Sequence, residues 1–266
     1  MTIPTHSLLE KLEKKAQKGS KPRCHLLTNG SPEDVARKLT SLIDPWGEVR
    51  PDHSWMPCGF DQIEEAQLGK AQHLLTDTQK KDLMTWWLAI PSPRANTPNW
   101  DIASECLIGG RPGLLLLEAK AHDMELHRER SRKRLSPSAS DNSVKNHKGI
   151  AACIESANVA LTHETGLKWS LSRDHHYQMS NRFAWSWKLA EIGVPVILVY
   201  LAFLDAAEMG TNGQTPLASD DQWARLVTGH SEPLFPSTVW NHSWTLHGQP
   251  FIPLIRSATV PLNSCS

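Results

Sequence analysis

The sequence has no excess of either charge. Its 266 residues include 28 lysines and arginines and 28 aspartates and glutamates, so the formal net charge is zero. A protein that fills a groove of nucleic acid usually carries a clear positive excess. Any contact with nucleic acid must therefore come from local patches of basic residues.

Paired cysteine motifs are also missing. The sequence has five cysteines, an odd number, and no two of them have the CxxC spacing of a zinc ribbon. This pattern argues against a disulfide framework and favours the reduced thiols of a cytoplasmic protein. The cysteines are Cys24, Cys58, Cys106, Cys153 and Cys265.

Long apolar runs are absent. The longest, residues 194–204, is too short for the roughly 20 residues that a transmembrane helix needs. The N-terminal segment MTIPTHSLLEKLEKK lacks the apolar core of a secretory signal. We therefore expect a cytoplasmic protein with no membrane partner.

Several common catalytic and nucleotide-binding motifs are not found either. The sequence contains no GxSxG nucleophile elbow and no HExxH zinc helix. Gly109, Gly110 and Gly113 imitate part of a dinucleotide fingerprint, but they lie in a predicted hairpin turn and open no helix. No internal repeat or linker divides the chain, so we expect a single domain over residues 1–266.

Helix and strand signals alternate along the chain. Ser31-Pro32-Glu33-Asp34 is a strong helix start, because Ser31 can cap the helix and the acids meet its positive end. The predicted helices cover residues 7–18, 31–43, 61–75, 150–161, 179–192 and 221–227, and a helix or turn covers residues 77–86. The predicted strands cover residues 100–108, 114–120, 194–204, 244–246 and 251–255.

One predicted strand ends in two charged residues. Residues 114–117 are leucines, a short apolar run typical of a strand covered on both faces, and Glu118-Ala119-Lys120 follows. Because side chains alternate along a strand, Glu118 and Lys120 point the same way. An unpaired buried charge is costly, so this pair needs a partner, a metal or an opening to solvent.

A predicted hairpin supplies a further acid. A turn centred between residues 109 and 112 places Asp101 opposite a residue between 118 and 122, close to Glu118. Two neighbouring carboxylates raise each other's pKa unless a cation lies between them. Their hard oxygen ligands suit Mg²⁺, which polarises a phosphodiester and lowers the pKa of bound water. Lys120 then orients that water or offsets negative charge on the phosphoryl oxygens.

A simpler interpretation of these residues stays open. Glu118 and Lys120 can pair only with each other at a strand end, and Asp101 can cap a turn after Pro98-Asn99. On this interpretation the three residues form an internal salt bridge in a structural or interaction protein.

Two segments that carry these residues, Thr97-Pro-Asn-Trp-Asp101 and Leu117-Glu-Ala-Lys120, resemble the PD-(D/E)XK nuclease superfamily, which has the restriction-endonuclease-like fold. The resemblance covers about residues 61–205 and implies an α/β core with a central mixed β-sheet flanked by helices. Residues 1–60 would then form an N-terminal helical extension, and residues 206–266 a C-terminal extension that packs on the core.

The resemblance also implies roles for individual residues. Asp101 and Glu118 would hold Mg²⁺ or Mn²⁺, and Lys120 would be the catalytic lysine. The residue before Asp101 is tryptophan where the signature has proline, a departure that many members tolerate. The family often adds an acid from the first core helix, for which Glu64 and Glu65 are candidates.

Four further residues are candidates for supporting or substrate-binding roles. His122 continues the alternation of the strand and would face the same site, unless it is a solvated residue beyond the strand. Gln178 and Arg182 share a helix face, with Asn181 beside them, and relatives place such residues near the substrate phosphate. An ordinary solvent-facing stripe is the alternative, and for Arg182 it is the preferred one.

Basic residues follow the candidate site directly in the sequence. Residues 127–134 contain five lysines and arginines and one glutamate. Such a run can contact phosphates, or it can be a charged mobile loop.

The sequence therefore predicts a Mg²⁺-dependent nuclease of the PD-(D/E)XK type whose partner is nucleic acid, DNA rather than RNA. A catalytically inactive nucleic-acid-binding or protein-interaction module on the same fold is the alternative. The zero net charge favours the alternative, whereas the presence of all three polar residues favours the enzyme.

Overall fold

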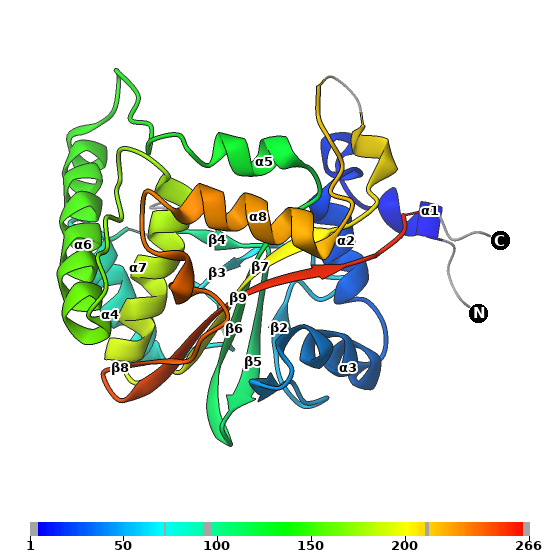
Figure 1. Cartoon of the computed structure of the whole chain (residues 1–266), viewed down its shortest axis with the longest axis horizontal. Helices are drawn as coiled ribbons and strands as arrows, with labels where there is room; N and C mark the ends of the chain where they lie inside the picture. Colours follow the sequence, from blue (N-terminus) through cyan, green and yellow to red (C-terminus); the bar gives the residue numbers. More distant parts are fainter. Residues whose placement is uncertain (1–4, 72, 93–96, 211–212, 263–266) are drawn as a thin grey trace.

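A mixed β-sheet with helices on both faces forms the centre of the molecule (Figure 1). The structure is a computed structural model and describes residues 5–71, 73–92, 97–210 and 213–262. The predicted α/β fold class is confirmed, with a mixed sheet as in a restriction-endonuclease-like core.

The sheet combines an antiparallel hairpin with parallel strands. The strands are β1 (Gly47–Glu48), β2 (Trp55–Met56), β3 (Ala66–Gln67), β4 (Asn99–Trp100), β5 (Ile102–Ile108), β6 (Arg111–Lys120), β7 (Val196–Phe203), β8 (Trp244–Leu246) and β9 (Gln249–Ala258). Their order is β1-β5-β6-β7-β9-β8, with β2 also paired to β5 and with β3 and β4 in a separate two-stranded sheet. β6, β7 and β9 run parallel, whereas β5 is antiparallel to β6 and β8 to β9.

Helices cover both faces of this sheet (Figure 1). The α-helices are α1 (Thr5–Leu9), α2 (Ser20–Leu27), α3 (Pro32–Ile43), α4 (Asp77–Trp87), α5 (Asp123–Arg128), α6 (Asp141–Thr165), α7 (Tyr177–Glu191) and α8 (Asp220–Ser231). Short 3-10 helices are η1 (Lys14–Ala16), η2 (Ala207–Met209) and η3 (Ser237–Val239). Residues of α2 and α3 pack on one face, and residues of α4, α6, α7 and α8 pack on the other.

The alternation of side chains along β6 divides the core into two layers. Leu115 and Leu117 pack with Ile43 beneath α3, whereas Leu114 and Leu116 belong to the larger layer on the opposite face. β7 is buried at every residue, as expected for a central strand covered on both faces.

The predicted helix starts at residues 32 and 77 are confirmed, the first of them with its predicted cap. Ser31 caps α3 by accepting a hydrogen bond from the backbone N–H of Asp34. Thr76 begins α4 with a reciprocal capping box that includes Gln79. α6 begins at Asp141, earlier than its predicted start.

The helix predicted over residues 7–18 is wrong. α1 ends at Leu9, and the separate α2, which sequence reasoning missed, begins at Ser20. Leu12 lies in a small buried cluster with Phe60 instead of on a continuous helix face. This contact between segments far apart in sequence is not visible in a local pattern.

The helix predicted over residues 61–75 is also wrong. The segment is irregular and contains β3, whose Ala66 pairs with Trp100 of β4. Pairing between distant segments here overrides the local helix propensity. The candidate acids of this segment therefore do not project from a helix.

The C-terminal residues complete the sheet. β9 lies between β7 and β8 and runs parallel to β7, with Val196 opposite Phe251. Residues 206–266, predicted as an extension that packs on the core, thus supply two strands of the sheet as well as α8.

Two further expectations concern membrane-spanning helices and disulfides. Within the described ranges, no helix has the length and apolar character needed to cross a membrane. The four cysteines in these ranges are free, and Cys265 lies outside the described residues.

Candidate active site

The β5–β6 hairpin sets the position of Asp101. Gly109 and Gly110 close its turn with φ angles of 57° and 77°, a conformation that glycine adopts without strain. Ile102 then pairs with Leu117. Continued by one residue, this register places Asp101 opposite residue 118, within the predicted range.

Asp101 is held by the main chain of β6. Its Oδ2 accepts a hydrogen bond of 2.8 Å from the backbone N–H of Ala119. Burial and the negative charge of Glu118 raise the pKa of Asp101 to about 8, although the positive charge of Lys120 opposes them. The negative charge of Glu118 therefore acts on the ionisation of Asp101.

Glu118 is surrounded by donors. Glu118 and Lys120 are 2% and 5% exposed and form an ion pair with each other. Arg182 of α7 donates from Nε to Glu118 Oε2 at 2.8 Å, and its Nη2 lies 2.6 Å from the same oxygen. Gln178 of α7 donates to Glu118 Oε1. Both carboxylate oxygens thus have partners from β6 and α7.

The charges of this network fix its protonation. Burial acts to raise the pKa of Glu118, but Lys120 and Arg182 outweigh it and lower that pKa to about 2. Burial acts to lower the pKa of Lys120, but Glu118, Glu129 and Asp101 raise it above its ordinary value. Lys120 is therefore an ammonium group at neutral pH, suited to stabilise negative charge and not to accept a proton.

α7 brings three of the candidate residues to the site, because this helix is buried along most of its length. Arg182 is only 5% exposed, so the preferred solvent-facing interpretation of this residue is wrong. Its guanidinium lies 4.5 Å from the ring centroid of Trp100 and donates to the Asn99 carbonyl at 2.6 Å. Asn181 accepts from Arg182 at 2.9 Å, while Gln178 reaches the site directly.

His122 is buried near the end of β6 but contacts a different acid. It is buried at 1% exposure, so the solvated alternative is wrong. Its Nε2 lies 3.6 Å from Oε1 of Glu125, one helical turn further along the chain. Among the described contacts, none joins His122 to Glu118 or Lys120, so its role in the site stays a prediction.

The two candidate acids before β3 differ in their surroundings. Glu65 lies 2.9 Å from Lys21 and accepts a hydrogen bond of 3.0 Å from Asn99. Its negative charge also contributes to the raised pKa of Asp101. Glu65, rather than Glu64, is therefore coupled to the candidate site.

Sequence reasoning missed two residues that extend the network. Oε1 of Glu129 lies 2.7 Å from Nζ of Lys120, and Nε2 of His230 in α8 lies 3.7 Å from Oε2 of Glu129. Burial raises the pKa of Glu129 to about 7 and lowers that of His230 to about 3. Glu129 is the one acid within the basic run at residues 127–134, a signal that could have identified it. His230 gives no such signal, because only the folded chain brings α8 to the site.

Buried polar atoms without a partner lie in this interior. Within the described part of the chain, Tyr200 Oη and both ring nitrogens of His230 have no hydrogen-bond partner. Burial and the nearby charges of Glu129 and Glu118 raise the pKa of Tyr200. Buried polar groups are normally satisfied by protein or water, so this region is suited to hold water or a small polar group.

Asp101 and Glu118 are the donors that a metal would use. Among the described residues, no three or more His, Cys, Asp or Glu side chains form a metal-ligating group. Mg²⁺ often takes only one or two carboxylates and completes its shell with water, so the two acids have the donor chemistry that it prefers. Because Lys120, Arg182 and Gln178 contact Glu118, a bound cation requires Glu118 to release at least one of them.

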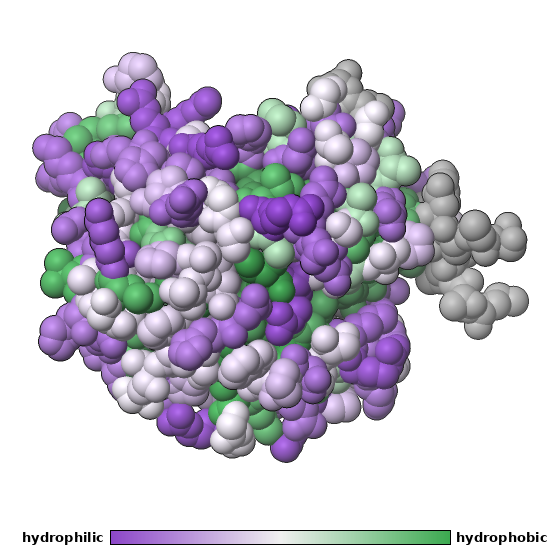
Figure 2. Space-filling model, in the orientation of Figure 1, coloured by the Kyte–Doolittle hydropathy of each residue, from purple (hydrophilic) through white to green (hydrophobic). Residues whose placement is uncertain are grey.

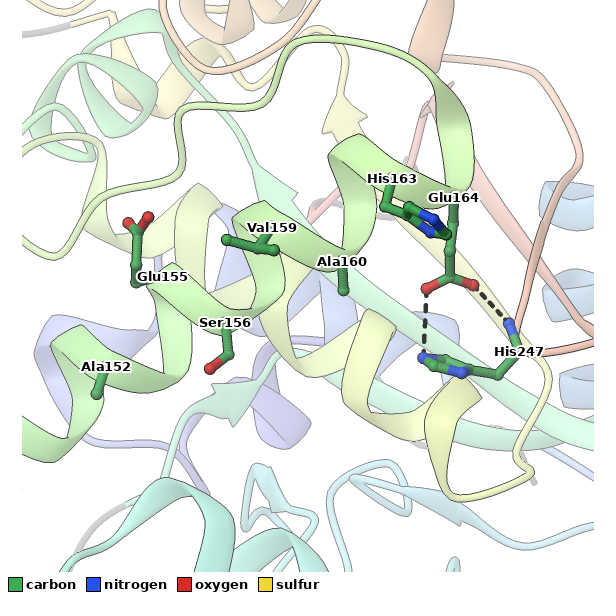
Figure 3. A pocket seen from close by; sticks show the side chains of 8 residues that line it. All are labelled: Ala152, Glu155, Ser156, Val159, Ala160, His163, Glu164 and His247. Atoms are coloured by element: carbon green, nitrogen blue, oxygen red, sulfur yellow. Dashed lines mark hydrogen bonds and ion pairs between the residues drawn. The ribbon is translucent and has the colours of Figure 1, made fainter.

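A cavity of about 800 Å³ lies elsewhere, along α6 (Figure 3). It is lined by Ala152, Glu155, Ser156, Val159, Ala160, His163, Glu164 and His247. Glu164 points toward His247, whose Nε2 lies 3.3 Å from Oε1 and whose backbone N–H donates to Oε2 at 2.7 Å. This pairing occupies the carboxylate of Glu164.

Comparisons with protein families, with curated proteins and with solved structures gave no match to this chain. A function therefore has to be argued from the side chains of the site itself.

Proposed function

We propose that the protein is a Mg²⁺-dependent nuclease of the PD-(D/E)XK type that hydrolyses phosphodiester bonds, in DNA rather than RNA. One observation carries the proposal. The hairpin and the alternation of β6 bring Asp101, Glu118 and Lys120 together where β6 ends. Clusters of buried charged groups with shifted pKa values occur preferentially at functional sites, which supports the proposal.

The chain's own residues would divide the work of hydrolysis. Asp101 and Glu118 would hold the cation, which when bound polarises a phosphoryl oxygen and lowers the pKa of water. The water oxygen bonds to phosphorus, the bond from phosphorus to the leaving oxygen breaks, and the water's proton passes to solvent while the leaving oxygen takes one up. Lys120 stabilises the negative charge that grows on the phosphoryl oxygens. Gln178, freed from Glu118, would donate to the phosphate.

A cleavage assay tests this proposal. Purified protein should cleave duplex or single-stranded DNA with Mg²⁺ or Mn²⁺ and stop when a chelator removes the metal. Asp101→Ala should abolish cleavage, and Lys120→Ala should lower its rate by about 10²-fold or more, because one stabilising donor is lost. Lys168→Ala changes an exposed lysine and serves as the matched control. Absence of metal-dependent cleavage of DNA and RNA would overturn the proposal.

One observation favours a second function, a nucleic-acid-binding or protein-interaction module without turnover. Lys120, Arg182 and Gln178 already satisfy both oxygens of Glu118, so the network is complete without a cation. Electron paramagnetic resonance of added Mn²⁺ separates the two functions. If the protein is the enzyme, the wild type binds Mn²⁺ and Asp101→Ala does not. If it is the module, neither protein binds Mn²⁺.

A further inference from the structure

A basic surface follows the candidate site in sequence and in space. The basic segment, as we call it, consists of Arg128, Arg130, Arg132, Lys133 and Arg134, of which only Lys133 is partly buried. It leads from α5 toward α6, and α5 itself follows directly after the end of β6. Figure 1 shows this connection at the upper left, and Figure 2 shows hydrophilic residues gathered over the same corner.

The cations of the basic segment are not neutralised by neighbouring acids. In the described ranges none of the five has a carboxylate within ion-pair distance. Glu129, the acid among them, points inward and pairs with Lys120. Some lysines elsewhere are neutralised, as Lys21 is by Glu65 at 2.9 Å. The basic segment is thus a local positive patch on a chain of zero net charge.

The basic segment is also anchored beside the site. The backbone N–H of Lys133 donates to the Arg173 carbonyl at 2.9 Å, and that of His176 donates to the Arg130 carbonyl at 3.1 Å. Nζ of Lys133 lies 4.8 Å from the ring centroid of Tyr177, the first residue of α7. These contacts tie the segment to the helix that supplies donors to Glu118, so it is not a free loop.

A recess lies between the basic segment and α6. Its volume is about 370 Å³, and Ile150 and Leu88 form part of its floor. Its polar lining is Lys133, Arg134, Ser136, Ser143, Asn146 and His147. Ammonium, guanidinium, hydroxyl and amide donors are the groups that contact phosphate oxygens in protein complexes with nucleic acid. Asp141, exposed at the start of α6, is the acid closest to the recess in sequence.

We propose that the basic segment and this recess form the surface on which the sugar-phosphate backbone of a nucleic acid lies when it reaches the site. This inference rests on the proposed function, since it names the path of that function's substrate. A polyanion is the matching occupant because a row of unpaired cations gains most from a row of phosphates, through release of bound counterions. A single free phosphate would fill the recess and leave the rest of the row unused.

The test measures binding without chemistry. Fluorescence anisotropy of a labelled DNA duplex is recorded in a chelator, from about 50 to 200 mM salt. The double variant Arg132→Glu, Arg134→Glu should bind about tenfold more weakly or worse, and its salt dependence should fall by about one unit of slope for each phosphate that the variant no longer neutralises. Lys14→Glu, Lys18→Glu carries the same change of charge on exposed lysines near the N-terminus and should bind like the wild type.

Three results would overturn the inference. They are failure of the wild type to bind DNA, an equal weakening in both double variants, and displacement of the DNA by inorganic phosphate at low millimolar concentration. Circular dichroism confirms that both double variants fold. The variant Asp101→Ala separates this inference from the proposed function. If Asp101→Ala binds DNA like the wild type but neither protein cleaves DNA, the binding surface is supported and the proposed nuclease function is overturned. If the wild type cleaves DNA and charge reversal in the basic segment changes neither binding nor cleavage, the nuclease function is supported and the binding surface is overturned.

Discussion

Arg182 is the residue that decides whether Glu118 is a metal ligand or a partner in an internal ion pair. Its guanidinium touches Glu118 Oε2, stacks on Trp100 and donates to the Asn99 carbonyl, so it fills a place beside Glu118 where a divalent cation would supply positive charge. Burial acts to lower the pKa of Arg182, but Glu118 raises it, so the side chain stays charged. The ion pair is thus retained whatever the pH of an ordinary assay.

Arg182→Met is expected to destabilise the protein. Removing one partner of a buried ion pair costs up to about 3–5 kcal/mol of unfolding free energy, and Lys120, which still pairs with Glu118, compensates part of the remaining charge. If Glu118 is a metal ligand, Mg²⁺ will restore more stability to this variant than it adds to the wild type, because the cation replaces the missing positive charge. Urea unfolding with and without Mg²⁺ measures both effects. Arg225→Met, at an exposed position of α8, should change stability by no more than about 0.5 kcal/mol. Equal effects of Mg²⁺ on the variant and the wild type would contradict a metal at Glu118.

Which site residues the sequence predicts depends on how each reaches the site. Asp101, Glu118 and Lys120 follow from strand alternation and a short hairpin, which are local rules. The shared helix face of Gln178 and Arg182 favours a solvent-facing stripe for Arg182, but α7 is buried on nearly all sides, which the local pattern does not show. Glu129 lies in a charged segment, and tertiary contacts decide which of its side chains turn inward.

The β5–β6 hairpin is the element that holds the site together. Its register pairs Ile102 with Leu117 and so brings Asp101 to the main chain of β6. The two glycines of its turn were enough to predict this register within a few residues. The helix predicted over residues 61–75 failed because β3 and β4 pair across a long stretch of sequence, and no local signal reports that pairing. Elements with a clear cap, a short turn or a long apolar run, as in β7, were thus predictable, whereas the two-residue β3, which only its distant pairing defines, was not.

Gly110→Val is expected to weaken this hairpin. Gly110 has a φ of 77°, and a side chain there would meet no atom within 4 Å, so the effect comes from the backbone alone. A non-glycine residue in this left-handed region costs about 1–2 kcal/mol. Gly110→Asn should cost less, because asparagine tolerates the region better than a β-branched residue does. Urea unfolding compares the two variants, and equal stabilities would show that the turn does not hold this conformation in solution.

At the scale of the whole molecule, β6, α8 and the segment after α5 meet around a buried pair of titratable residues, Glu129 and His230. Burial lowers the pKa of His230 from 6.5 to about 3 and raises that of Glu129 from 4.5 to about 7. Lys120 faces both groups. The other charged or titratable groups that act on the pair are Glu118, Arg182, His176, Arg130 and His127. Because the pair lies between elements that only the folded chain assembles, its protonation is linked to global unfolding.

The two groups act on stability in opposite directions. Below pH 6.5 the unfolded chain binds a proton at His230 that the folded chain does not, so His230 lowers the free energy of unfolding as the pH falls toward 3. Above pH 4.5 the folded chain keeps a proton at Glu129 that the unfolded chain has lost, so Glu129 lowers the free energy of unfolding as the pH rises toward 7. Between these limits the two slopes offset each other, and below pH 4.5 only His230 acts.

Glu129→Gln removes one side of this balance and is expected to make the protein sensitive to acid in a range where the wild type is not. Relative to the wild type, its free energy of unfolding should fall with decreasing pH between 6.5 and 4.5, by up to about 1.4 kcal/mol per pH unit for one proton. His230→Gln should show the opposite difference, and the double variant should return to the wild-type slope. Urea unfolding over this range measures all four proteins, and the comparison cancels the titration of distant groups. Parallel curves for the wild type and Glu129→Gln would mean that the pKa of Glu129 is not raised in the folded protein, because Lys120 then offsets the effect of burial.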